Sequence, residues 1–350
     1  MTASPAIPEP AATPPASFAP ARPATPGVGQ DQAGLAPGAA SAPPGAPVRG
    51  SRGRHAGPAL AQPTGAELRA AAAGRALGVL SVLRANPLAT AGGLILVAMI
   101  VLCFAGPAFY HTDQTHVFLS QANLSPRAGH PLGTDNDGSD ELGRLMKGGQ
   151  VSLEVGAAAG VLAALLGSLW GAAAGYLGGV VDAVMMRIVD AGIAIPVIVL
   201  LLVIRSLYQP STTTLILFIA GTSWLSTARL VRAEALTLRT REYVQAARVM
   251  GGGGVRAIVR HIAPNAMGTI VVNVTFQIAG AILVLAALSW LGLGVPYPSV
   301  DWGDMLGAAT QTIDDGYWWQ ILAPGLAIVV VVVALTMLGD GLRDGLAHDE

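Results

Sequence analysis

Five side chains that could bind a metal ion lie close together in one polar stretch of the sequence. They are His130, Asp135, Asp137, Asp140 and Glu141. Carboxylates and imidazole are common ligands of divalent cations, so a metal site would be chemically reasonable here. A solvated polar loop accounts for the same residues without any ligand. The sequence favours that loop, and we predict no metal-binding residue.

Two acidic residues in an apolar region, Asp182 and Asp190, raise the alternative of an intramembrane aspartyl protease. Asp182, however, falls at the expected membrane edge, about 12 Å along a helix from Asp190. Neither a G-x-S-x-G nor an H-E-x-x-H motif occurs. The only lysine, Lys147, does not follow a phosphate-binding glycine loop, so this chain has no such loop for ATP. We therefore predict no catalytic residue and no bound cofactor.

These polar residues interrupt a chain that is too apolar for a soluble globular protein. Of its 350 residues, 52% are hydrophobic and only 12% are charged, against about 25% charged in soluble domains. Six segments are long and apolar enough to cross a bilayer as helices, which takes about 20 residues each. They are Ala89–Tyr110, Val151–Tyr176, Val181–Leu207, Thr213–Leu230, Ala266–Leu291 and Gln320–Leu338. We predict an all-α integral membrane protein with six transmembrane helices.

The composition changes along the chain. Residues 1–66 hold 14 of the 24 prolines, mixed with Ala, Gly and Ser, and are expected to form a disordered cytoplasmic tail before a six-span domain at 67–350. The second span is rich in Gly and Ala ("GAAAGVLAALLGSLWGAAAG"), which predicts close packing against neighbouring helices. The single cysteine, Cys103, lies in an apolar run and is expected to be a buried, inert thiol.

Basic residues are unevenly distributed between alternate loops. If the N-terminus is inside, the inner segments hold 16 of the 20 lysines and arginines. The positive-inside rule then places both termini in the cytoplasm, with an outer loop at 111–150 and a cytoplasmic hairpin at 231–265. Aromatic residues near the last, acidic outer segment are expected at the membrane interface. They are Trp302, Tyr317, Trp318 and Trp319.

The stretch "REYVQAARVMGGGGVRAIVRHIAPN", residues 241–265, predicts two short amphipathic helices. On a helix, Tyr243, Ala246, Ala247 and Met250 form one apolar stripe, and a second stripe follows the four glycines, which allow a sharp reversal. Such a hairpin could lie on anionic lipid, with its arginines near the headgroups. It could equally dock a partner protein against its small alanine face. Nucleic-acid binding is not expected, because the basic face is short and lacks interleaved aromatic residues.

The same stretch resembles the EAA loop of permease subunits of bacterial ABC importers. That loop has the pattern E-A-A, three residues, G, nine residues and I-x-L-P. Ala246, Ala247, Gly251 and Pro264 match at the same spacing, whereas Gln245 replaces the acidic residue and the Ile and Leu positions also differ. The resemblance implies that the first helix docks in a groove of an ATP-binding subunit. The residues that would carry this coupling are Tyr243, Gln245, Ala246, Ala247, Met250, Gly251 and Pro264.

Further segments resemble the dipeptide and oligopeptide branch of these permeases, whose members also move nickel. They are "HPLGTDNDGSDELGRLMKGG", "DAGIAIP", "SWLGLGVPYPSVDWGDML" and, near the C-terminus, "GDGLRDGL". The resemblance covers about residues 85–346 and implies a fold like that of type I ABC importer permeases, in a bacterial inner or plasma membrane. The implied partners are a second homologous permease subunit, two ATP-binding subunits or domains, an extracytoplasmic substrate-binding protein and membrane lipid. The implied cargo is dipeptides or oligopeptides, with nickel or another small solute as the alternative. A different kind of function, a membrane scaffold whose hairpin lies on lipid, is the alternative to transport.

Polar residues inside the predicted spans are further candidates for function. Arg187 and Asp190 lie three apart in the third span and are predicted to form an intramembrane ion pair. Asn273 and Gln277 lie four apart in the fifth span and are candidates for lining a transport path, because amides can hydrogen-bond passing peptide groups. A helix–helix hydrogen bond explains these two residues equally well. Glu154, near the outer end of the second span, is expected to reach toward the interface.

Overall fold

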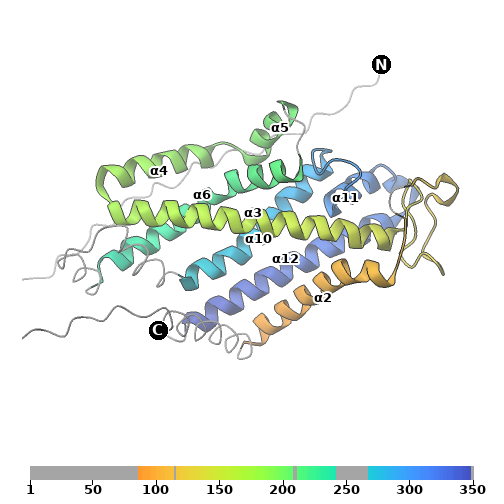
Figure 1. Ribbon diagram of the computed structural model, residues 1–350, viewed down its shortest axis with the longest axis horizontal. Coiled ribbons are helices and arrows are strands. Elements are labelled where there is room, and N and C mark those ends of the chain that lie inside the picture. The colour runs from red at the N-terminus through yellow and green to blue at the C-terminus, as the bar shows by residue number, and fades with distance from the viewer. Residues whose placement is uncertain (1–85, 114–115, 208–210, 242–266, 348–350) are drawn as a thin grey trace, which may run out of the picture. The chain divides into compact units, whose positions relative to one another are not determined.

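The computed structural model describes residues 86–113, 116–207, 211–241 and 267–347. The chain divides into two units, residues 1–61 and 62–350, and all described residues belong to the second. The described residues contain no β-strand, only two isolated β-bridges. Their α-helices are α2 (Pro87–Phe109), α3 (Glu141–Leu177), α4 (Gly179–Ala194), α5 (Val197–Leu207), α6 (Thr212–Arg239), α10 (Met267–Trp290), α11 (Trp302–Thr310) and α12 (Trp318–Ala347) (Figure 1). The all-α prediction is confirmed for this part of the chain.

Five helices are long and apolar enough to cross a membrane, namely α2, α3, α6, α10 and α12. The pair α4 and α5 supplies a sixth crossing if it is one span bent by 78°, which agrees with the six predicted crossings. The break falls at Ile195, whose backbone is extended, and at Pro196, whose ring cannot continue an unbroken helix. The predicted third span is therefore two helices rather than one.

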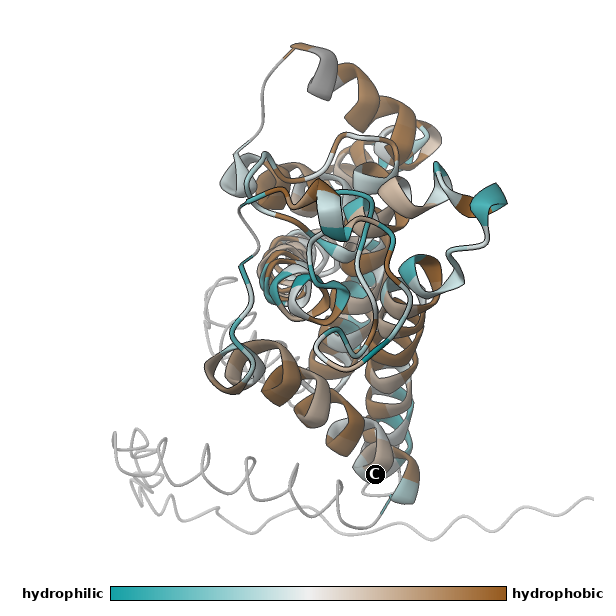
Figure 2. Cartoon of the chain, turned by 90° about the vertical axis from the view of Figure 1, so that its right-hand side faces the viewer, coloured by the Kyte–Doolittle hydropathy of each residue, from teal (hydrophilic) through white to brown (hydrophobic). Residues whose placement is uncertain are grey.

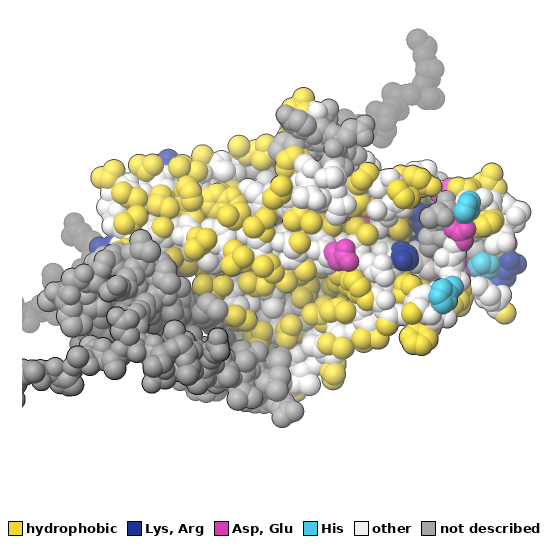
Figure 3. Space-filling view, viewed as in Figure 1, with side chains coloured by type: hydrophobic (Ala, Val, Ile, Leu, Met, Phe, Trp, Pro, Cys, Tyr) yellow, Lys and Arg dark blue, Asp and Glu magenta, His cyan; other side chains and the backbone are white. Residues whose placement is uncertain are grey.

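The flanks of the helices are apolar where a soluble protein would be polar. Large aliphatic side chains are exposed along α2, α4 and α12, including Leu94, Val180 and Val329. Figure 3 shows hydrophobic side chains over much of the visible flank, an acidic side chain near its middle, and histidine side chains toward the end that carries residues 111–140. Figure 2 looks onto that end and shows hydrophilic loops over hydrophobic helices. This distribution fits a bundle surrounded by lipid.

Helix α3 is the centre of the bundle and contacts α2, α4, α6, α10, α11 and α12. It presents Gly167, Gly171 and Gly175 to α6, one on each successive turn. A side chain at any of these positions would overlap backbone atoms of α6; at Gly171, a Cβ would lie 2.9 Å from the backbone nitrogen of Arg232. The close packing predicted from the Gly- and Ala-rich sequence is confirmed.

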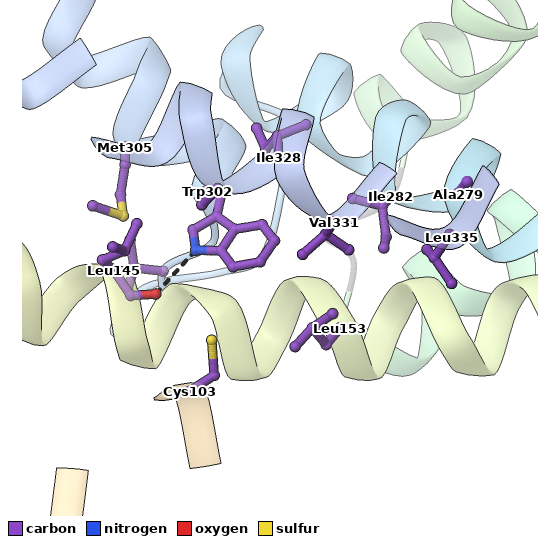
Figure 4. Close-up of a cluster of buried hydrophobic side chains, with 12 residues drawn as sticks. Cys103, Leu145, Leu153, Ala279, Ile282, Trp302, Met305, Ile328, Val331 and Leu335 are labelled. Carbon is purple, nitrogen blue, oxygen red and sulfur yellow. Dashed lines mark hydrogen bonds between the residues drawn. The ribbon is translucent and has the colours of Figure 1, made fainter. Parts of the chain in front are cut away.

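Helix α11 was not expected, and it changes the role of Trp302. Asp301 begins α11 by accepting the backbone N–H of Gly303 at 2.8 Å, as an N-cap residue does. Trp302 then points into the bundle, where it is fully buried and its Nε1 donates to the carbonyl oxygen of Leu145 at 2.9 Å. Figure 4 shows the indole among side chains of α3, α10 and α12, including Val331. The prediction that Trp302 lies at the membrane interface is wrong, because the new helix turns it inward.

The neighbouring tryptophans Trp318 and Trp319 also differ in their exposure. Trp319 is buried, and its Nε1 donates to the carbonyl oxygen of Thr134 at 3.1 Å, so it packs the 111–140 segment onto the bundle. Trp318 is 60% exposed and keeps the environment expected of an interfacial residue. Cys103 is buried, as predicted.

Candidate functional site

The polar segment between α2 and α3 is folded rather than solvated. Asp135, Asp140 and Glu141 are all buried. Asp140 caps α3 through one oxygen, while its other oxygen accepts the Tyr110 hydroxyl at 2.9 Å and lies 2.9 Å from Nδ1 of His130. The expectation of a solvated loop is wrong for these three acidic residues. Backbone and side-chain donors replace water around Asp135 and Asp140, which is why the cluster can be buried.

Arg144 joins this acidic segment to α11. Its Nη1 lies 2.5 Å from Oδ2 of Asp135 and 3.7 Å from Oδ2 of Asp137, and its Nη2 lies 3.9 Å from Oδ2 of Asp304. Burial raises the pKa of Asp135, and the Arg144 guanidinium opposes that rise. Glu141 is only 2% exposed, and its Oε1 has no hydrogen-bond partner within the described structure. No group of three His, Cys, Asp or Glu side chains in the described ranges is arranged to hold a metal ion.

A cavity of about 550 Å³ lies beside Arg144, and we call this end of the bundle the cavity end. Its walls come from the first turns of α3, from α11, from the 111–140 segment and from residues 295–300. Its polar lining includes His116, Asp137, Arg144, Lys147, Gln150 and Asp304. Ligand sites occupy about 300–1,000 Å³, so the cavity is large enough for a small polar solute.

The α3 wall of this cavity continues along one exposed face of the helix. Lys147 and Glu154 are exposed, and Gln150 and Val151 between them are half-buried. Seven residues make nearly two helical turns, so Lys147 and Glu154 point in almost the same direction. Neither takes part in an ion pair with another described residue.

The opposite end of the bundle flanks the predicted coupling hairpin. Helix α6 ends and α10 begins at that end, away from the cavity (Figure 1). The start of α2 and the end of α12 meet there too, where the Asn86 side chain donates to the carbonyl oxygen of Gly341 at 3.3 Å. The predicted coupling residues all lie outside the described ranges, and their role stays a prediction, as does the assignment of this end to the cytoplasm. They are Tyr243, Gln245, Ala246, Ala247, Met250, Gly251 and Pro264.

The predicted ion pair between Arg187 and Asp190 is replaced by pairs between two helices. Asp190 accepts from Nη2 of Arg229 on α6 at 2.6 Å, and Arg187 is exposed. One helical turn away on α6, Arg232 binds both oxygens of Asp182, at 2.5 and 2.6 Å. The prediction is wrong because α6 packs alongside α4 and brings Arg229 and Arg232 within reach of the two aspartates of α4. Two aspartates eight residues apart, with two arginines three apart on an antiparallel helix, were the sequence signal for these pairs.

The predicted path residues Asn273 and Gln277 both form hydrogen bonds with α6. The hydroxyl of Thr227 donates to Oδ1 of Asn273 at 2.7 Å. Nε2 of Gln277 donates to the carbonyl oxygen of Ser223 at 2.9 Å and also contacts the Thr227 hydroxyl. The helix–helix hydrogen bond, the alternative weighed for these amides, is thus present, and a role in lining a path stays a prediction.

The apolar helices and the polar end of the bundle define a polytopic helical membrane protein with a charged cavity at one end. Residues 165–349 match the family described as "Binding-protein-dependent transport system inner membrane component", and residues 78–126 match the "N-terminal TM domain of oligopeptide transport permease C". The chain is 36% identical over 264 residues to the dipeptide transport system permease protein DppC of Bacillus subtilis (strain 168), covering 75% of this chain and 82% of the relative. It is also 36% identical over 263 residues to the oligopeptide transport system permease protein OppC of the same organism, covering 75% and 86%. The chain belongs to the family of binding-protein-dependent transport permeases, which are multi-pass bacterial membrane proteins.

Proposed function

We propose that this chain is one of two membrane subunits of an ATP-driven importer of dipeptides or oligopeptides. The relatives described above are named for peptide transport, which supports peptides rather than nickel as the cargo. A second, homologous permease subunit would complete the transport path. Two ATP-binding subunits would hydrolyse ATP, and an extracytoplasmic binding protein would deliver the peptide to the cavity end.

One observation of the structure carries the proposal. The charged cavity lies at one end of the bundle, whereas α6 and α10, which flank the EAA-like residues, end and begin at the other. An importer needs this separation, because its cargo enters on one side while the energy source acts on the other. A ligand bound at one end can bias the other only if one structural element reaches both sites. The long helices α3 and α6, packed backbone to backbone, are such an element.

Purification from the native membrane in mild detergent tests the assembly. We expect this chain to co-purify with a second permease subunit and one or two ATPases, and the complex in proteoliposomes to take up a labelled dipeptide when ATP and the binding protein are present. A chain that purifies alone or only with itself would contradict the proposed assembly.

Substitutions in the hairpin test the coupling role. Gly251→Pro and Ala246→Glu should abolish ATP-dependent uptake and weaken ATPase co-purification while leaving the subunit in the membrane, because both change the proposed docking helix or its end. Thr240→Glu is the matched control: it adds a carboxylate at an exposed position after α6 but outside the EAA-like residues. Normal uptake in both hairpin variants would refute the docking role and favour a hairpin that lies on lipid.

A further inference from the structure

Two opposite charges share one face of α3 at the cavity end. Lys147 lines the cavity directly, together with Gln150 and Val151. Glu154 follows on the same face, three residues after Val151 and four after Gln150. Residues three or four apart on a helix are surface neighbours, so Glu154 lies next to the α3 residues that line the cavity, just outside the lining itself.

Glu154 is better suited to water than to lipid. A glutamate in contact with lipid is unfavourable, and charged residues in spans mostly face protein or a water-filled path. Within the described structure, the two aspartates of α4 form ion pairs with α6, Asp182 with Arg232 and Asp190 with Arg229. Glu154 is exposed and takes part in no such pair. The polar cavity is lined on α3 by Lys147, Gln150 and Val151, so its lining comes within one helical turn of Glu154.

We propose that Lys147 and Glu154 form a binding site for the two charged ends of a short peptide, with Lys147 receiving the carboxylate and Glu154 the amino terminus. This site rests on the proposed peptide transport. Seven residues of helix separate the two side chains by about 10 Å along the axis. An extended chain spans about 3.3–3.6 Å per residue, so a peptide of about three residues has its charged ends at that separation.

The placement of the two charges also sets the orientation of the peptide. Lys147 lies six residues after the start of α3 at the cavity end, and Glu154 lies deeper in the bundle. The peptide therefore enters with its amino terminus first. Arg144, the other cation of this wall, is already bound to Asp135, which leaves Lys147 as the cation for the peptide carboxylate.

Thiol labelling tests whether this face is in water. Cys103 is the only cysteine of the chain and is buried, so Glu154→Cys gives this subunit one exposed thiol. In the complete complex in its membrane, a membrane-impermeant maleimide should label Glu154→Cys at least about tenfold faster than Val97→Cys, because thiolates form in water and not in lipid. Val97 is exposed on the apolar surface of α2 and serves as the matched control. Equal, slow labelling of both variants would overturn the proposal.

Protection by peptide tests the ligand. With Val151→Cys as the reporter between the two charges, a free tripeptide should slow labelling, and its N-acetylated form should require about tenfold higher concentration. Adding Glu154→Gln should remove the difference between the two peptides. Adding Asp315→Asn, which removes an exposed carboxylate at the same end but outside the cavity, should leave the difference intact.

The remaining outcomes separate this proposal from its rivals. If Glu154→Gln weakens co-purification of the second permease subunit and leaves peptide protection unchanged, Glu154 pairs with that subunit and the peptide site is refuted. If the wild-type complex takes up peptide but protection does not depend on Glu154, the proposed function stands and only this site fails. If the wild-type complex with its binding protein takes up no peptide at all, the proposed function itself fails.

Discussion

The contact between α3 and α6 leaves no room for a side chain, and one methyl group measures how tight it is. In Gly171→Ala, the new Cβ would overlap the backbone carbonyl oxygen of Ala228 and would lie 2.9 Å from the backbone nitrogen of Arg232. Comfortable contacts begin at about 3.5 Å, so relieving the overlap with the Ala228 carbonyl oxygen would require the two backbones to separate by about 1 Å. Overpacking of this kind costs about 1–3 kcal/mol.

Gly221→Ala on α6 is the matched control, because a Cβ there meets nothing within 4 Å. Both substitutions gain the same helix propensity, up to about 1 kcal/mol, so the difference between the two variants isolates the overpacking term. We expect Gly171→Ala to be less stable than Gly221→Ala by about 1–3 kcal/mol in the free energy of unfolding, measured by SDS titration in mixed micelles with helicity as the signal. If the two variants were equally stable, the backbone contact described here would be wrong.

Three further predictions concern other contacts. In a double-mutant cycle, Asp182→Ala and Arg232→Ala should show a coupling energy of about 1–3 kcal/mol in the free energy of unfolding, and additive effects would exclude the ion pair. Trp302→Ala should lower that free energy by about 3–5 kcal/mol, whereas Trp302→Phe should lose mainly the hydrogen bond to Leu145, about 1 kcal/mol; equal losses would count against the buried indole. Burial raises the pKa of Asp301 in the folded state, so the folded protein binds a proton at this carboxylate more readily than the unfolded chain does. As the pH falls from the folded-state pKa toward the ordinary value, the wild-type protein should therefore gain stability relative to Asp301→Asn. If the difference in the free energy of unfolding between wild type and Asp301→Asn stays constant with pH, the raised pKa of Asp301 is contradicted.

The membrane spans could be predicted from sequence because lipid imposes a simple rule. Every span must be about 20 apolar residues long and satisfy its backbone internally, so composition alone locates the five long helices α2, α3, α6, α10 and α12. The glycines of α3 could be interpreted in the same way, since their four-residue spacing has few uses other than close helix packing. The interruption at Pro196 also follows from local chemistry, because proline removes a donor and restricts the residue before it.

The polar residues could not be placed in the same way, because their partners are far away in the sequence. Arg187 and Asp190 lie three residues apart on one helix, yet Asp190 pairs with Arg229, 39 residues later. Nothing in the sequence around Trp302 indicates that its indole will donate to Leu145, 157 residues earlier. The burial of the acidic cluster escapes prediction for the same reason: its composition is that of a solvated loop, and only the folded caps and Arg144 make burial possible.

The packing also decides which parts of the subunit can move together. Helix α6 leads from the middle of the bundle directly toward the EAA-like residues, and Gly167, Gly171 and Gly175 hold α3 against it without an intervening layer of side chains. Backbones in such contact cannot slide without a clash, because packed interiors have few alternative arrangements. A displacement of the hairpin would therefore move α3 with α6, and α3 carries Lys147 in the cavity wall at its other end. Helix α4, held to α6 by two ion pairs, should follow the same motion. The small residues of α3 thus hold the bundle together and would also carry the proposed coupling between its two ends.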